Sequence, residues 1–314
     1  MLFRSFDQTR CIVCPRECLT DRTQAKGACG ADAHLKISLA TLHFGEEPVL
    51  SGYEAHRARV VTSSQGETLS GGSGTIFFSH CNLRCIYCQN YQISHLGHGR
   101  QISDDELLNI IFGLQDQGAL NINLVSPTQY TAQLFPVLKQ AKAAGLRIPI
   151  VWNSNAYEKI ECIHALGELI DIWLPDFKYA DKYHARKYSG ISDYPSIAIE
   201  AIKAMWDYAG ELQTDFWGIA SRGVMIRHLV LPNRLSSSKE ALRMIYNAIG
   251  NTVSLSLMAQ YYPTASCSGY PELSRSITYD EYQEVLDTAE ELGFENIFAQ
   301  ELRPTPDWTP DFDR

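Results

Sequence analysis

Seven short apolar runs recur from Thr75 onward, and this rhythm constrains the fold more than any other feature of the chain. The runs are TIFFS (75–79), NINLV (121–125), IPIVW (148–152), DIWLP (171–175), VMIRHLVL (224–231), SLSLM (254–258) and NIFAQ (296–300). Segments with the spacing of amphipathic helices separate them. Because strands that alternate with helices form parallel sheets, and continuous apolar runs suit strands covered on both faces, we predict an α/β fold of βα units.

Three of the intervening helices have the same kind of predicted start. Each has a Ser or Thr followed three residues later by Glu, as in Ser103/Glu106, Ser237/Glu240 and Thr278/Glu281. This is the capping box, in which hydroxyl and carboxylate each accept a bond from the other residue's backbone amide. About six βα units are too few for an eight-stranded barrel, which leaves a partial barrel or an open doubly wound sheet. In both, ligands bind at the carboxyl ends of the strands.

Composition and charge narrow the class of protein. The 314 residues are 45% hydrophobic and 20% charged, as in an ordinary globular protein. A net charge of −9 is the opposite of a basic footprint for phosphate backbones, so we expect no nucleic-acid partner. The start MLFRSFDQTRC lacks the apolar run of a secretory signal, and no stretch reaches the roughly 18 apolar residues of a membrane helix. We therefore expect a cytoplasmic protein with no membrane partner.

Nine cysteines, several of them closely spaced, favour metal thiolates over disulfides in a reducing compartment. Residues 1–50 hold a first group with the spacing C-x2-C-x3-C-x10-C, namely Cys11, Cys14, Cys18 and Cys29. Four thiolates saturate one zinc ion or one 4Fe-4S cluster, so we expect a small N-terminal Cys-rich metal-binding segment. The choice of metal stays open, and a redox dithiol or plain buried cysteines are the alternatives to metal binding.

A second group, Cys81, Cys85 and Cys88, follows the first apolar run with the spacing C-x3-C-x2-C. Three thiolates this close share one metal centre. A four-iron cubane held by three cysteines leaves one iron open, which can bind a small molecule and pass it an electron. A zinc ion completed by His80 or His95 is the alternative.

The second group, with the aromatic Tyr87 before its last cysteine, resembles the radical S-adenosylmethionine (SAM) superfamily. Within it the chain is most similar to proteins labelled pyruvate formate-lyase activating enzyme-like, through the stretches CIVCPREC, SGTIFFSHCNLRCIYCQNYQIS, NINLVSPTQY, LPDFKYAD, LMAQYYP and YPELSR. The resemblance implies a partial (β/α)6-type barrel over residues 74–314. It also implies a 4Fe-4S cluster that reductively cleaves SAM to a 5'-deoxyadenosyl radical for hydrogen abstraction.

The resemblance further implies residues that hold SAM at the ends of the strands. These are Tyr87 over the adenine, Ser126 in the LVSPT stretch that replaces the Gly-Gly-Glu of many relatives, Asn153 and Asn155 near the ribose, Asp176 and Lys178 at the methionine end, and Arg227 at the SAM carboxylate. Gln260 and Tyr261 are weaker candidates for the adenine edge. The ordinary alternatives are a core tyrosine, a strand-to-helix turn at the asparagines, and a surface ion pair.

Residues 51–73 have a polar, Gly-punctuated composition and are interpreted as a loop inserted before the strand that leads to the cysteines. We expect this loop to form a lid or a substrate contact. Cys162 lies at an apolar-periodic position of a predicted helix and is expected in the core. Cys267 is interpreted as an incidental loop cysteine, with donation of hydrogen to a substrate radical as the alternative.

Together these features predict a radical SAM oxidoreductase that acts on a small molecule, a peptide or a glycyl-radical protein. The resemblance implies a reducing partner such as flavodoxin or ferredoxin. The alternative is an iron-sulfur or zinc-binding electron-transfer or scaffold protein without SAM chemistry. Polar residues at almost every strand end favour a catalytic barrel over such a carrier. Methyl transfer by the polar route is disfavoured because the chain lacks a Gly-rich nucleotide loop.

Overall fold

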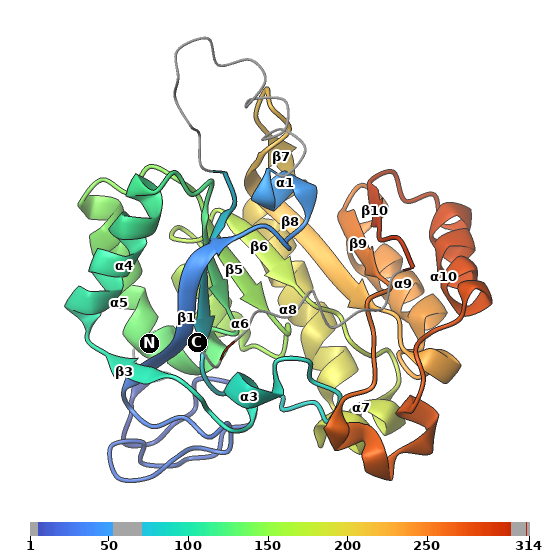
Figure 1. Cartoon of the computed structure of the whole chain (residues 1–314), viewed down its shortest axis with the longest axis horizontal. Helices are drawn as coiled ribbons and strands as arrows, with labels where there is room; N and C mark the ends of the chain where they lie inside the picture. The colour runs from blue at the N-terminus through green and yellow to red at the C-terminus, as the bar shows by residue number, and fades with distance from the viewer. Residues whose placement is uncertain (1–5, 53–70, 303–311, 313–314) are drawn as a thin grey trace.

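A single mixed sheet forms the centre of the computed structural model, which describes residues 6–52, 71–302 and 312 (Figure 1). The strand order is β10-β9-β8-β6-β5-β4-β2-β1-β3, and β7 pairs with β8. The strands are β1 (Leu35–His43), β2 (Ser73–Phe78), β3 (Arg100–Ile102), β4 (Ile122–Val125), β5 (Ile150–Ser154), β6 (Ile172–Pro175), β7 (Gln213–Thr214), β8 (Ala220–Leu229), β9 (Ser254–Met258) and β10 (Ile297–Ala299). Each of the seven predicted apolar runs is confirmed as a strand.

The seven strands β2, β4, β5, β6, β8, β9 and β10 are all parallel, and each lies beside the strand that precedes it in this series. A doubly wound sheet would reverse its strand order at a switch point. This order never reverses, which is the winding of a barrel. Six helical connections join the seven strands. Within the described residues the two end strands of the order, β10 and β3, do not pair with each other, so the barrel stays open. The fold is therefore the predicted partial barrel.

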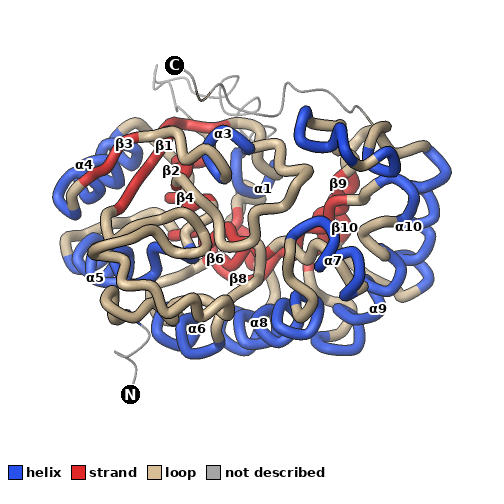
Figure 2. Tube along the Cα trace, turned by 90° about the horizontal axis from the view of Figure 1, so that it is seen from below, coloured by secondary structure: helices blue, strands red, loops and turns tan. Residues whose placement is uncertain are grey.

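Helices cover the convex side of this partial barrel, as Figure 2 shows in a view onto the carboxyl ends of the strands. The covering helices are α4 (Asp104–Asp116), α5 (Thr131–Ala143), α6 (Ile160–Leu166), α8 (Tyr194–Ala209), α9 (Ser238–Ile249) and α10 (Tyr279–Glu291). Helix α7 (Lys182–Ser189) lies at the carboxyl ends of the strands and packs on α8. The short helices α1 (Pro48–Ser51) and α3 (Tyr91–Ser94) lie on the inner side. Short 3-10 turns are η2 (Thr128–Tyr130), η3 (Pro232–Arg234), η4 (Ala265–Gly269) and η5 (Pro271–Leu273).

The main core lies between the sheet and the outer helices. All residues of β4, β5, β6 and β9 are buried, which is the burial on both faces that their apolar character predicts. Trp152 and Trp173 are fully buried on neighbouring strands and meet edge to face with centroids 6.4 Å apart. The strands are thus held rigidly, and their carboxyl ends form a fixed platform for side chains.

Two of the three predicted capping boxes are confirmed and the third is wrong. Ser103 with Glu106, and Thr278 with Glu281, make both reciprocal bonds. Ser237 precedes α9 as predicted, but its φ of 52° is left-handed and its side chain accepts no capping bond. An N-cap hydroxyl reaches the helix amides from extended backbone. The left-handed turn through Asn233 and Arg234 delivers the chain to α9 in a different direction.

Residues 7–34 consist of turns and loops, and β1 then adds antiparallel to β2 and β3 at one edge of the sheet. The expected division into residues 1–50, 51–73 and 74–314 stays a prediction. Most of the expected inserted loop, residues 53–70, lies outside the described residues. None of the helices in the described part of the chain has the length and apolar character needed to cross a bilayer.

The two kinds of helix start predict different responses to alanine. Thr278→Ala should lower the free energy of unfolding by about 1 kcal/mol, because the Glu281 amide loses its acceptor. Ser237→Ala should change it by less than about 0.5 kcal/mol, since no cap is lost. Urea unfolding of both variants checks this, and equal losses would contradict the assignment of the caps.

Candidate functional site

A cavity of about 830 Å³ lies inside the partial barrel and opens among the carboxyl ends of the parallel strands. Its wall comprises the loop after β2, the ends of β4, β5, β6, β8, β9 and β10, and the connection between β1 and α1. All ten of the residues predicted to bind the catalytic cluster and SAM line it: Cys81, Cys85, Tyr87, Cys88, Ser126, Asn153, Asn155, Asp176, Lys178 and Arg227. These ten residues come from five strand ends or loops and converge on one space.

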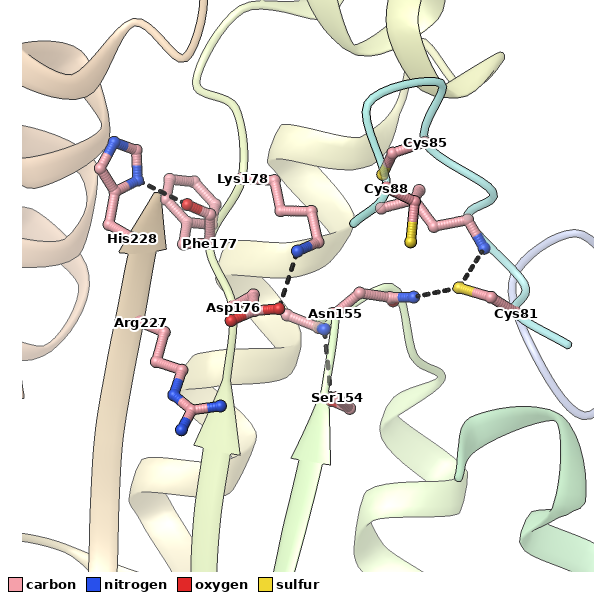
Figure 3. Close-up of polar contacts among 12 residues, drawn as sticks. Cys81, Cys85, Cys88, Ser154, Asn155, Asp176, Phe177, Lys178, Arg227 and His228 are labelled. Carbon is pink, nitrogen blue, oxygen red and sulfur yellow. Dashed lines mark hydrogen bonds and ion pairs between the residues drawn. The ribbon is translucent and has the colours of Figure 1, made fainter. Parts of the chain in front are cut away.

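The three cysteines lie in the loop that follows β2, residues 79–90, which we call the cysteine loop (Figure 3). Each sulfur accepts a hydrogen bond from a side chain outside this loop. Asn155 Nδ2 is 3.4 Å from Cys81 Sγ, Ser189 Oγ is 3.1 Å from Cys85 Sγ, and Ser94 Oγ is 3.2 Å from Cys88 Sγ. Donors to sulfur stabilise thiolate character and tune a metal centre.

Burial raises the pKa of Cys85, and it raises the pKa of Cys88 to about 12. Thiols in such surroundings ionise only beside a cation, which a metal centre supplies. No group of three or more His, Cys, Asp or Glu side chains stands at the spacing for one metal ion in the part of the chain that the structure describes. A cubane binds each thiolate through a different iron, so three cysteines of one loop can share a cluster.

Both histidines of the zinc alternative have other close contacts. The ring nitrogens of His95 lie 2.9 Å from Ser94 Oγ and 3.2 Å from the carbonyl oxygen of Arg84. The ring of His80 packs so closely against Gly97 that a Cβ there would lie 2.3 Å from it. His95 thus has partners for both ring nitrogens, and His80, which lines the cavity with the sulfurs, is packed against Gly97.

Asp176 and Lys178 follow β6 and form an ion pair of 2.7 Å inside the cavity, with side chains only 20% and 18% exposed. Burial opposes the charge of Lys178, but the Asp176 carboxylate outweighs it and raises the pKa of Lys178. The ammonium also lies near Cys85 and Cys88, as Figure 3 shows. This pair is not the surface ion pair of the ordinary interpretation.

Tyr194, which the sequence analysis missed, holds this strand end in place. Its hydroxyl lies 3.0 Å from the carbonyl oxygen of Asn155 and 2.8 Å from that of Asp176, and it accepts a bond from the Lys178 amide at 2.9 Å. One buried phenol therefore joins the ends of β5 and β6. Tyr194 is the first residue of α8, and no sequence motif around it predicts this role.

The asparagines after β5 combine turn geometry with a contact to the cysteine loop. Asn155 Oδ1 accepts a bond from the Tyr157 amide, as in an Asx turn. Its Nδ2 donates to Asn82 Oδ1 at 2.8 Å in addition to Cys81 Sγ. Ser126, at the end of β4, has a left-handed φ of 56° and donates its amide to the carbonyl oxygen of Asn153. These contacts fix the ends of neighbouring strands against each other.

The aromatic candidates differ in how they meet the cavity. Tyr87 lines the cavity with only 4% of its surface exposed. Its ring packs edge to face on Tyr179 and Tyr261. Gln260 also lines the cavity. Tyr261 points away, since it is fully buried and its hydroxyl donates to the carbonyl oxygen of Leu273 at 2.7 Å.

Arg227 is engaged by two carboxylates that the sequence analysis did not single out, Glu46 and Glu47 from the connection between β1 and α1. Its Nε donates to Glu47 Oε1 at 2.7 Å, and its Nη2 pairs with both glutamates. The three side chains are 13%, 7% and 7% exposed. Burial opposes ionisation of Glu47, but the guanidinium outweighs it and lowers the pKa of that carboxyl. Only tertiary contact could reveal this group, because no local spacing joins β1 to β8.

Two further buried groups support the strand ends from behind. Glu158 accepts bonds from Thr128 Oγ1 at 2.6 Å and from Trp152 Nε1 at 2.8 Å, and burial raises the pKa of its carboxyl. His228 has its pKa lowered to about 4, chiefly by burial, and its Nδ1 donates to the carbonyl oxygen of Phe177 at 2.6 Å (Figure 3). It thereby fixes the turn between Asp176 and Lys178.

The N-terminal cysteines gather beside the cysteine loop. Cys11, Cys14 and Cys18 form a small cluster with Cys162, and a Cβ on Gly27 would lie 3.5 Å from Cys18 Sγ and 3.6 Å from Cys29 Sγ. All four are free thiols, and a metal bound to them stays a prediction.

The two remaining cysteines lie in the interior. Cys162 is buried as predicted, and its Sγ donates to the carbonyl oxygen of Val13 at 3.2 Å. Cys267 is buried beside Thr264 Oγ1 at 3.5 Å and does not line the cavity. The ordinary interpretation of both thiols as packing groups agrees with these positions.

Fold and site define an α/β partial barrel whose cavity brings three free thiols together with a buried carboxylate–ammonium pair. Residues 75–211 match the family model described as Radical SAM superfamily. The uncharacterized protein MJ0674 of Methanocaldococcus jannaschii is 29% identical over 296 residues, which cover 92% of this chain and 76% of that protein. The pyruvate formate-lyase-activating enzyme of Clostridium pasteurianum is 25% identical over 181 residues, 56% of this chain and 68% of that enzyme.

The match over residues 75–211 supports the resemblance of this chain to the radical SAM superfamily. That family implies a 4Fe-4S cluster and SAM as cofactors. Among solved structures, Streptococcus suis SuiB bound to precursor peptide SuiA matches with a TM-score of 0.48 and 15% identity, over 70% of this chain and 46% of that chain. The match thus spans less than half of the SuiB chain.

The Arg227 group predicts a pH-dependent loss of stability. Arg227→Met should lower the free energy of unfolding at neutral pH by about 3–5 kcal/mol, because two buried carboxylates lose their cation. The lowered pKa of Glu47 contributes stability that is present above the ordinary glutamate pKa and is lost as pH falls through the lowered value. In the variant, burial without the cation raises the pKa of Glu47, so this carboxyl protonates and the difference from the native chain shrinks as pH falls.

Urea unfolding at several pH values measures this difference. Arg222→Met is the matched control, since Arg222 lies on the same strand with an exposed side chain. A loss that is absent, or the same at every pH, would contradict the buried pairing.

Proposed function

We propose that this radical SAM enzyme is an oxidoreductase in which Cys81, Cys85 and Cys88 hold the 4Fe-4S cluster and SAM occupies the adjoining cavity. One observation carries the proposal: the three thiols, the Asp176–Lys178 pair and the polar ends of β4 and β5 line the same space of about 830 Å³. When bound, cluster and SAM supply the reductive cleavage that yields a 5'-deoxyadenosyl radical for hydrogen abstraction. An electron carrier or a scaffold needs no cavity of this size beside the thiols.

Different residues of the cavity bind different parts of SAM in this proposal. Asp176 and Lys178 hold the methionine end, where a fixed carboxylate and ammonium match an amino acid's own charges. Asn153 and Asn155 face the ribose, and Tyr87 offers an apolar surface to the adenine. Ser126 contributes a hydroxyl in place of a carboxylate.

Arg227 has a structural role in this proposal. Its Nε and one terminal nitrogen are engaged by Glu46 and Glu47, so it fixes the floor of the cavity and the adjacent Asp176. Direct contact between Arg227 and the SAM carboxylate stays a prediction. The N-terminal cysteines hold a second metal, zinc or a 4Fe-4S cluster.

For the substrate, we propose hydrogen abstraction from a small molecule, a peptide or a glycyl-radical protein. The similarity to the Clostridium pasteurianum enzyme favours glycyl-radical activation among these. A reducing partner such as flavodoxin or ferredoxin supplies the electron. The competing proposal, an iron-sulfur or zinc protein without SAM chemistry, predicts the same cysteines but no bound nucleoside.

Anaerobic reconstitution with iron and sulfide, followed by dithionite and SAM, should release 5'-deoxyadenosine. The Cys81, Cys85 and Cys88 triple alanine variant should release none, because the open iron is lost. Cys267→Ala is the matched control, a buried thiol outside the cavity. An intact cluster that leaves SAM uncleaved would defeat the proposed function.

Metal analysis of the triple variant also identifies the N-terminal metal, since retained zinc without iron excludes a second cluster that relays electrons.

Lys178→Met should weaken SAM binding roughly tenfold or more, because a charge-assisted bond to the SAM carboxylate is lost. Lys182→Met, whose side chain is exposed at the start of α7, should bind SAM as the native chain does. Equilibrium dialysis of unreduced, reconstituted protein with SAM measures affinity without turnover. Equal affinity in the native chain and Lys178→Met would remove this residue from the SAM site.

A further inference from the structure

Arg16 joins the two cysteine groups that the sequence presents as separate. It lies between Cys14 and Cys18, yet its guanidinium group donates three hydrogen bonds to residues outside the N-terminal segment. Its Nε donates to the carbonyl oxygen of Asn82, and its Nη2 lies 3.2 Å from that of Leu83 and 3.5 Å from that of Ser189.

The three acceptors of Arg16 surround the first two cysteines of the cysteine loop. Asn82 and Leu83 are two of the three residues between Cys81 and Cys85. Ser189 donates its own hydroxyl to Cys85 Sγ at 3.1 Å. One guanidinium therefore touches the backbone on both sides of the Cys85 sulfur.

A second contact lies at the other end of the N-terminal segment. Gly30, beside Cys29, has a left-handed φ of 93° and approaches His80, the residue before Cys81, so closely that a Cβ would lie 2.9 Å from Nδ1. Arg22, 1% exposed, donates to the carbonyl oxygen of Gln129 at 2.5 Å. The Gln129 side chain in turn donates to the carbonyl oxygen of His80 at 3.1 Å. The segment thus meets the cysteine loop before Cys81 and after it.

The shape of the N-terminal segment depends on its four thiols. Residues 7–34 contain no helix or strand, and their apolar cluster consists mainly of the cysteines with Val13. Turns alone recover little of the entropy lost on ordering such a segment, whereas a structural metal contributes on the order of 10 kcal/mol. Whatever holds the sulfurs together therefore sets the position of Arg16.

We propose that residues 7–34 form a metal-dependent clamp on the cysteine loop, with Arg16 as its positioning residue. The inference rests on the proposed cluster at Cys81, Cys85 and Cys88. The loop needs support because Arg84 is left-handed, with a φ of 57°, and because buried carbonyl groups require donors. The clamp supplies those donors and keeps Cys81 and Cys85 at a fixed separation, so N-terminal metal binding stabilises the catalytic cluster.

Arg16→Gln tests the clamp on reconstituted full-length protein. Loss of the charge-assisted bonds should make the cluster bleach roughly tenfold faster under a chelator, while the N-terminal metal is retained. Arg10→Gln is the matched control, an exposed arginine next to Cys11. Visible absorbance gives the rate, and metal analysis with electron paramagnetic resonance identifies what is lost. Bleaching of Arg16→Gln at the native rate would overturn the proposal.

A second variant separates the metal from the arginine. Cys14→Ala removes an N-terminal ligand and should speed bleaching as Arg16→Gln does, and combining the two should add little because both act through one contact. A Cys14→Ala chain that loses its N-terminal metal but keeps the native bleaching rate would show that the clamp is not metal-dependent. The readout needs no SAM cleavage, so a stable cluster that leaves SAM intact fails the proposed function alone. A native chain that assembles no cluster overturns both.

Discussion

The site depends on a line of alternating charges that crosses the buried cavity. Glu46 and Glu47 hold Arg227, Arg227 lies beside Asp176, and Asp176 pairs with Lys178, whose ammonium faces Cys85 and Cys88. Each of these charges would be costly in isolation, because an unpaired buried ion loses its hydration without compensation. Each is stabilised by its neighbour of opposite sign. The line ends at the thiols, so it favours their ionised form, which is the form that binds metal.

Strand register explains why residues far apart in sequence meet in this cavity. Val125 pairs with Asn153, and Ser154 pairs with Pro175, so Ser126, Asn155 and Asp176 follow at the same edge of the sheet. The parallel direction makes every strand deliver its next residue to that edge. Tyr194 then ties two of these strand ends together through their carbonyl groups. The polar side chains of the site gather at this edge because the carboxyl ends of several strands meet there on a rigid sheet.

The seven strands and the two cysteine groups could be predicted because they depend on local signals, namely apolar runs and cysteine spacing. The other predicted residues that line the cavity came from the resemblance to a known family. The remaining features depend on contacts between distant segments. Nothing in the local sequence distinguishes Glu46 and Glu47, and their role follows only from their contact with Arg227 on β8. The role of Arg16 likewise follows only from its three distant acceptors. Ser237 shows the reverse case, because its sequence fits a cap and the preceding left-handed turn prevents one. Local patterns thus locate elements, while tertiary contacts decide which side chains become paired.

The LVSPT stretch at the end of β4 changes which carboxyl groups face the cavity. Where many relatives are expected to carry a glutamate, Ser126 turns in a left-handed conformation, and its carbonyl oxygen is occupied by Gln129 Nε2 at 2.7 Å. The hydroxyl is therefore the acceptor that Ser126 has left to offer the cavity. A carboxyl behind this strand end, Glu158, accepts a bond from Thr128 of the same stretch, and burial raises its pKa. Because that carboxyl supports the turn instead of facing the cavity, the carboxyl groups that line the cavity belong to other segments, namely Asp176, Glu46, Glu47 and Glu301.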